Sequence, residues 1–211
     1  MRNAVVAPPA LVAAALALCL AAATAPADPI VLTMVPEDFA NLGATTVAGT
    51  LLTPTYDDNG AFTGTVYSKV YNTTGGDYLY LYQVRNGGPS VLEKQVVFPI
   101  APVDQAGYLT ANEPSEFLGG GSTPLSIVYD PILLLRTLGF DYPAGGGFDI
   151  GAGEHSTVVY VLSSSPPRMG ESHVIDGGTG SVEVWTSEPA SLALLAGGGT
   201  LLLLRRKRRR A

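Results

Sequence analysis

Two neighbouring stretches carry the clearest pattern of apolar and polar positions in the chain. Phe62–Asn72 and Asp77–Asn86 are rich in tyrosine, valine and threonine, which favour strands, and Thr73-Thr74-Gly75-Gly76 between them is typical of a turn. Because side chains alternate along a strand, the second stretch has tyrosines on one face and leucines on the other. The pattern predicts a β-hairpin whose second strand is central in its sheet.

Short strand-like segments separated by glycine and proline fill the rest of the body. Asp57-Asp58-Asn59-Gly60 is typical of a hairpin turn, because Asn-Gly readily adopts positive φ. Asp130–Gly139 has helix-forming and capping residues, but it is equally consistent with a buried strand. We expect an all-β fold, an antiparallel β-sandwich of the immunoglobulin-like or jelly-roll-like kind. Further strands are expected at Ile30–Val35, Thr46–Leu52, Val91–Pro99, Leu125–Tyr129, Thr157–Ser163 and Ser181–Thr186.

The N-terminus has the pattern of a secretory signal peptide. Arg2 precedes an apolar run, Leu11–Ala23, and small residues at Ala25 and Ala27 occupy the two positions that signal peptidase reads. We therefore expect residues 1–27 to be removed, leaving Asp28 as the mature N-terminus. A cut after Ala25 is the competing choice, but it would leave Pro26 directly after the scissile bond.

The C-terminus has a second apolar segment. Residues 190–204 would extend roughly 22 Å as a helix, short of the ~30 Å hydrocarbon core, and three consecutive glycines weaken that helix. A basic cluster follows and favours the cytoplasmic side of a membrane: Arg205, Arg206, Lys207, Arg208, Arg209 and Arg210. These residues predict a single transmembrane helix that holds the chain temporarily, with the body on the opposite side.

Charge and cysteine content restrict what the body can be. It holds 17 of the 18 acidic residues but only five of the 12 basic ones, a net charge of about −12. The only cysteine, Cys19, lies in the expected signal peptide, so no disulfide or thiolate site is available to the mature protein. This balance argues against nucleic acid as a partner and fits a soluble surface or matrix protein.

Few residues of the body suggest chemistry. Glu154-His155 and Glu171-Ser172-His173 contain both histidines, but their spacing matches no recognised zinc motif. Asp57–Gly60 resembles the start of a calcium loop without its closing glutamate. The chain also lacks a Gly-x-Ser-x-Gly nucleophile motif. We expect no catalytic residue, no metal site and no cofactor, so the protein is not expected to be an enzyme.

The tyrosines of the second hairpin strand raise one binding hypothesis. Aromatic rings stack on the apolar faces of sugars and offer a hydroxyl at the edge, so Tyr78, Tyr80 and Tyr82 are candidate glycan contacts. Tyrosines at this density also commonly cover a sheet without binding anything.

The last 25 residues combine the polar motif Ser187-Glu188-Pro189-Ala190-Ser191, an apolar run and a basic cluster. This order resembles the PEP-CTERM sorting signal of bacterial exosortase substrates, with Ser-Glu-Pro in place of the usual Pro-Glu-Pro. The resemblance implies export, transient insertion in the inner membrane, and cleavage near Glu188-Pro189 by a membrane-embedded cysteine protease. Within the body, Tyr78–Asn86, Ile150–Ser156 and Ile175–Gly178 also resemble recurrent elements of such proteins, less specifically.

Together these features predict three parts: a signal peptide (1–27), an extracytoplasmic β-sandwich (28–186) and a sorting signal (187–211). The resemblance implies a structural or surface role linked to exopolysaccharide and biofilm, with signal peptidase and exosortase as processing partners. The mature protein is expected at the cell surface or outside the cell. A glycan-binding module that uses the tyrosine-rich sheet is the alternative, and a metal-dependent hydrolase is a weaker one.

Overall fold

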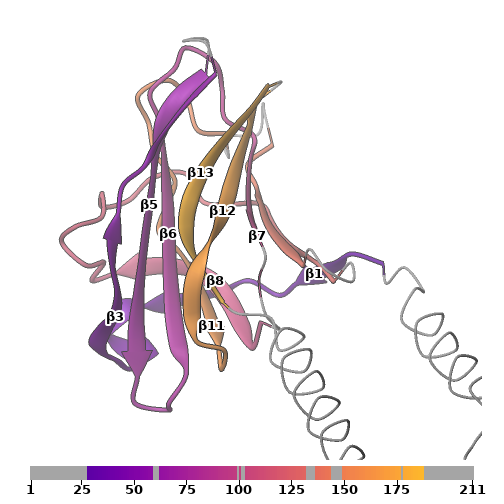
Figure 1. Ribbon diagram of the computed structural model, residues 1–211. Helices are drawn as coiled ribbons and strands as arrows, with labels where there is room; N and C mark the ends of the chain where they lie inside the picture. Colours follow the sequence, from indigo (N-terminus) through magenta and orange to yellow (C-terminus); the bar gives the residue numbers. More distant parts are fainter. Residues whose placement is uncertain are drawn as a thin grey trace, which may run out of the picture.

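Strands make up nearly all regular structure in the computed structural model, which describes residues 28–58, 62–98, 100, 103–131, 136–143, 149–176 and 178–187 (Figure 1). The all-β prediction is confirmed for these residues. One short 3-10 helix, η1, spans Phe39–Leu42. The strands are β1 (Ile30–Leu32), β2 (Val35–Asp38), β3 (Ala44–Leu52), β4 (Thr55–Asp58), β5 (Phe62–Thr73), β6 (Tyr78–Asn86), β7 (Lys94–Phe98), β8 (Gln105–Ala111), β9 (Ser126–Asp130), β10 (Thr137–Asp141), β11 (Val159–Ser163), β12 (Pro167–Asp176) and β13 (Gly178–Ser187).

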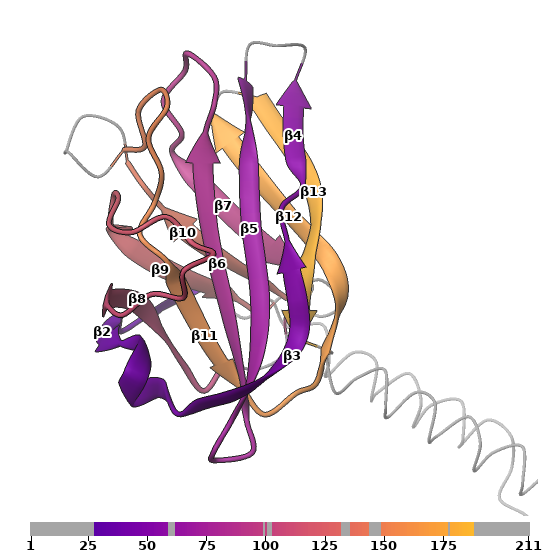
Figure 2. The same cartoon turned by 90° about the vertical axis from the view of Figure 1, so that its left-hand side faces the viewer.

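The strands form two sheets that face each other (Figures 1 and 2). Sheet A has the order β1-β9-β10-β7-β12-β13, and sheet B has the order β2-β8-β11-β6-β5-β3, with β4 paired to β5. Neighbouring strands run antiparallel except for β2 and β8, which are parallel. The sheets are therefore antiparallel, as predicted, apart from one pair at the edge of sheet B.

The predicted hairpin is the longest strand pair of sheet B. β5 and β6 pair from Gly64 opposite Asn86 to Asn72 opposite Tyr78, and the Thr73 backbone N–H donates to the Asp77 carbonyl at 2.9 Å to close the turn. β6 lies between β5 and β11, and its side chains from 79 to 84 are all buried. This confirms the prediction of a central strand, which follows from apolar residues on both of its faces.

The main core lies between the two sheets. From sheet B it receives the inward side chains of β4, β5, β6, β8 and β11, and from sheet A those of β7, β9, β10, β12 and β13. Facing sheets bury apolar side chains in a layer about 10 Å thick, and that burial is the main stabilising contribution. Its large fully buried members include Tyr56, Tyr80, Tyr82, Phe140 and Ile127.

A second, smaller apolar cluster covers the outer face of sheet B. Leu79, Leu81 and Tyr160 project to this face and are covered by η1 and by residues 112–118, which we call the strap. The strap residue Phe117 is 6% exposed, and Phe39 of η1 packs edge-on against Tyr71 with ring centroids 5.4 Å apart. Sheet B is therefore buried on both faces around β6.

Four strands were not predicted: β2, of which the expected strand Ile30–Val35 covers only the first residue, β4, β8 and β12. β12 lacks an apolar alternation because the core side of its first half carries Gly170 and Ser172. A Cβ at Gly170 would lie 2.5 Å from Thr186 Oγ1, so the absent side chain makes room for the neighbouring strand. In β8 a neighbouring strand also approaches a glycine closely: a Cβ at Gly107 would lie 1.8 Å from the carbonyl oxygen of Val35 in β2. Close backbone packing replaces side-chain burial at both places.

The helix considered for Asp130–Gly139 is wrong in the part that the structure describes. Asp130 ends β9, and Thr137–Asp141 forms β10 between β9 and β7. Leu138 and Phe140 point into the core, so the buried-strand alternative holds there. Residues 132–135 lie outside the described residues.

Both predicted targeting segments lie outside the described residues. These are residues 1–27, with Ala25 and Ala27, and residues 188–211, with most of the sorting motif and the basic cluster. Within the part of the chain that the structure describes, no helix has the length and apolar character needed to cross a bilayer.

Candidate functional site

The tyrosines proposed as glycan contacts do not form an exposed row. Tyr80 and Tyr82 are 0% exposed and point into the core between the sheets. Tyr78 is partly buried and packs against the same core. The glycan-contact prediction is therefore wrong for Tyr80 and Tyr82, because a ring enclosed between two sheets has no face for a sugar to stack on.

The hydroxyls of the two buried tyrosines donate hydrogen bonds to backbone carbonyls. Tyr80 donates to the Ser165 carbonyl and Tyr82 to the Trp185 carbonyl, both at 2.7 Å. Burial raises the pKa of both phenols, with a smaller contribution from a neighbouring tyrosine. Each hydroxyl thus satisfies a carbonyl distant in sequence and stays protonated at any ordinary pH.

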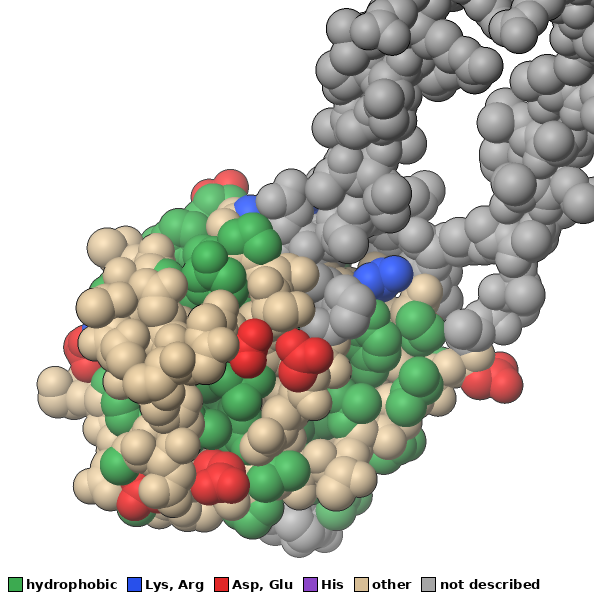
Figure 3. Space-filling model, turned by 90° about the horizontal axis from the view of Figure 1, so that it is seen from below, with side chains coloured by type: hydrophobic (Ala, Val, Ile, Leu, Met, Phe, Trp, Pro, Cys, Tyr) green, Lys and Arg blue, Asp and Glu red, His purple; other side chains and the backbone are tan. Residues whose placement is uncertain are grey.

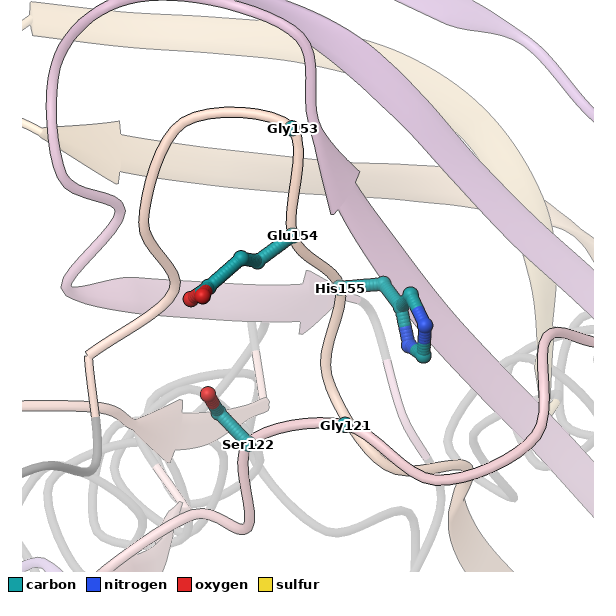
Figure 4. Close-up of a pocket in the computed structure, with 5 residues that line it drawn as sticks. All are labelled: Gly121, Ser122, Gly153, Glu154 and His155. Atoms are coloured by element: carbon teal, nitrogen blue, oxygen red, sulfur yellow. The ribbon is translucent and has the colours of Figure 1, made fainter.

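A shallow depression lies beside His155 at one end of sheet B. Gly121, Ser122, Gly153, Glu154 and His155 line it, and its volume is about 380 Å³. Figure 4 shows the Glu154 carboxylate and the Ser122 hydroxyl pointing toward each other, while the His155 ring points away from both. Gly153 has φ of +79°, a backbone conformation that favours glycine at the tip of this loop.

The polar groups around this depression already have partners within the protein. Ser122 Oγ donates to the Asp149 carbonyl at 2.8 Å, and Glu154 Oε2 accepts from the Gly151 backbone N–H at 3.0 Å. His155 Nδ1 lies 3.1 Å from the Ser156 carbonyl oxygen. The Ser122 hydroxyl thus donates to a backbone carbonyl, whereas a nucleophilic serine donates to a base.

The second histidine lies on the outer face of sheet A. His173 Nε2 is 3.5 Å from Glu171 Oε2, and its ring packs edge-on against Phe98 with centroids 4.5 Å apart. Among the described residues, no group of three or more His, Cys, Asp or Glu side chains comes together. Zinc sites use three or four protein ligands, and the described residues bring no such set together.

Asp57 and Asp58, whose segment resembles the start of a calcium loop, lie in a hairpin. Asp57 pairs with Thr63 and Asp58 with Phe62 in the β4–β5 ladder, so both carboxylate residues are strand residues. Asn59 and Gly60 lie outside the described residues. The hairpin interpretation is confirmed for the two strands that flank this turn.

Two buried amides on β6 organise the loops around it, and the sequence did not reveal them. Gln83 Nε2 donates to the carbonyls of Leu118 and Ser156 at 2.7 and 2.8 Å, and its Oε1 accepts from the Leu118 N–H at 2.9 Å. Asn86 Nδ2 donates to the Ile150 carbonyl at 2.9 Å. The segment Tyr78–Asn86 thus supplies structural contacts on both faces of its sheet.

Ser187 is the one residue of the predicted sorting motif that the structure describes. It is the last residue of β13, it is 0% exposed, and it pairs with Pro167. Two positions earlier, the Trp185 indole N–H donates to the Thr50 carbonyl at 2.7 Å. The motif therefore begins inside a firmly packed strand.

Acidic side chains are spread over the described surface and form no single site. Figure 3 shows them at several separate places on the face seen from below. The charged contacts of the described lysines are structural: Lys69 pairs with Glu116 of the strap, and Lys94 Nζ lies 2.9 Å from Asp141 Oδ1.

Known proteins offer no further guide to this arrangement. No family model matches the chain, and no curated protein and no solved structure was found to match it.

Proposed function

We propose that this chain is an exported, non-enzymatic envelope or extracellular-matrix protein of a bacterium. Its tail acts as a PEP-CTERM sorting signal and is removed by an exosortase. The proposal comes from the sequence of the two ends and their resemblance to that family. The link to exopolysaccharide and biofilm comes from the same resemblance.

One structural observation supports the division of the chain above all others. β1 begins at Ile30, two residues after the expected mature N-terminus, and pairs with β9; β13 ends at Ser187, the first residue of the expected sorting motif, and pairs with β12. The first and last described strands are therefore both built into sheet A. Removal of both ends would leave every described strand in place.

The finer features belong to the same proposal. The two facing sheets suit an immunoglobulin-like or jelly-roll-like sandwich. Residues 190–204 would hold the precursor in the inner membrane, with Arg205–Arg210 on the cytoplasmic side. Signal peptidase would act after Ala27, and the mature protein would reach the cell surface or the surroundings.

A structural role fits the described surface better than the competing functions. The depression at Ser122 and His155 is shallow, and its polar atoms bond within the protein. The glycan-binding alternative loses its two main aromatic contacts, Tyr80 and Tyr82, to the core. No described feature favours the hydrolase alternative.

Pulse–chase labelling in the native host tests tail removal. We expect the wild-type precursor to lose its C-terminal tail and leave the membrane fraction, while a variant with Glu188→Ala and Pro189→Ala accumulates as membrane-bound precursor. Ser181→Ala is a matched control, because it changes an exposed residue of the last strand and leaves the motif intact. Equal processing of the motif variant and the control would refute the proposed signal.

A further inference from the structure

The end of β13 lies only a few residues before the predicted membrane segment. Ser187 is fully buried and paired, and only Glu188 and Pro189 separate it from Ala190. The three Cα–Cα steps from Ser187 to Ala190 span at most about 11 Å. A protease that cuts near Glu188-Pro189 therefore meets a substrate whose N-terminal side is part of a folded sheet.

Side chains of sheet B fasten this end of β13 from the other side. The Trp185 backbone N–H donates to Ser68 Oγ at 3.1 Å, and its carbonyl accepts from the Tyr82 hydroxyl at 2.7 Å. Its ring lies against Gly49, where a Cβ would come within 2.7 Å of the ring atom Cε2. The outer edge of β13 is thus bonded across to β5 and β6 at Trp185.

Proteases bind chain segments that are exposed and free to extend, and cleavage of a folded protein depends on how often the segment opens. We propose that opening of the Pro167–Ser187 end of the β12–β13 ladder controls processing of the tail. This inference rests on the proposed function. It adds that the body regulates its own release, through contacts made by residues far from the motif.

A disulfide across the ladder tests the closed state. Arg168 and Thr186 are direct partners in the register, and residues so paired lie within the Cα separation that a disulfide spans. Arg168 Nε and Thr186 Oγ1 are buried without a hydrogen-bond partner, so replacing them breaks no bond at these atoms. In Arg168→Cys/Thr186→Cys, we expect the oxidised precursor to be processed at least about tenfold more slowly than either single-cysteine variant.

A variant remote from the motif tests the open state. Tyr82→Phe removes the hydroxyl that bonds the Trp185 carbonyl, so this end should open more often and processing should be about three to ten times faster. Tyr160→Phe is the matched control: it removes the hydroxyl that donates to the Val35 carbonyl at 3.0 Å and accepts from Gln105 Nε2 at 2.7 Å, and neither partner belongs to β13. Its processing rate should remain within about twofold of wild type.

Both measurements use the full-length precursor in membranes of the native host, with C-terminal tail loss as the readout. Slower processing of the cross-linked variant together with faster processing of Tyr82→Phe supports the inference. If wild type is processed but neither variant differs from its control, the inference is overturned and the proposed function stands. If the wild-type tail is never removed, the inference and the proposed function are both refuted.

Discussion

Replacement of Gln83 by leucine should destabilise the domain by opening the strap. The side chain is fully buried and makes three hydrogen bonds to backbone groups, two with Leu118 and one with Ser156. At about 1 kcal/mol for each net bond, the loss is roughly 3 kcal/mol, since leucine has a similar volume but leaves these backbone groups unpaired. For a domain of this size that corresponds to a Tm lower by about 6–12 °C.

Urea unfolding followed by tryptophan fluorescence measures this loss, and chymotrypsin cleavage after Phe117 reports strap opening directly. Gln105→Leu is the matched control, because its amide makes one bond, to the Tyr160 hydroxyl at 2.7 Å, and is only partly buried. It should cost about 1 kcal/mol or less. Equal losses for the two variants, or a protected Phe117 in Gln83→Leu, would refute the role given to Gln83.

Three further results are expected. Tyr82→Ala should lower the free energy of unfolding by about 3–5 kcal/mol, because it leaves a cavity in the core. Tyr78 is only partly buried, so Tyr78→Ala should lower the free energy of unfolding clearly less. Denaturation curves that rank the two variants the other way would contradict the core position of Tyr82. The hydrogen bond from Lys69 lowers the pKa of Glu116, so this carboxylate stabilises the fold above its unfolded pKa and the contribution disappears as the pH falls through the lower folded pKa. Glu116→Gln should therefore flatten the fall in urea midpoint below roughly pH 4.5, and an unchanged profile would contradict it. At alkaline pH, the raised pKa of Tyr82 makes stability fall as the pH rises above about 10, and absorbance at about 295 nm should show its ionisation only together with unfolding.

The sequence predicts the hairpin and the central position of β6 because the information is local. Alternating apolar residues on both faces of Tyr78–Asn86 require cover on both sides, and the structure provides it with the second sheet and the strap. Alternation does not reveal which face meets the second sheet. In the structure the tyrosine face of β6 packs against the second sheet, and for this reason the glycan hypothesis is wrong for Tyr80 and Tyr82.

Contacts between distant segments account for the features that the sequence did not predict. The acceptors of the buried tyrosine hydroxyls, Ser165 and Trp185, are 85 and 103 residues away along the chain. Gly170 and Gly107 serve as strand residues only because another strand approaches them closely. Such pairings become visible only when the sheets are assembled.

The intact mass of the mature protein, purified from its native host, tests the central claim most directly. The account predicts a species that begins at Asp28, retains β13 through Ser187 and lacks Arg205–Arg210. A mature protein that still carries these arginines would contradict it.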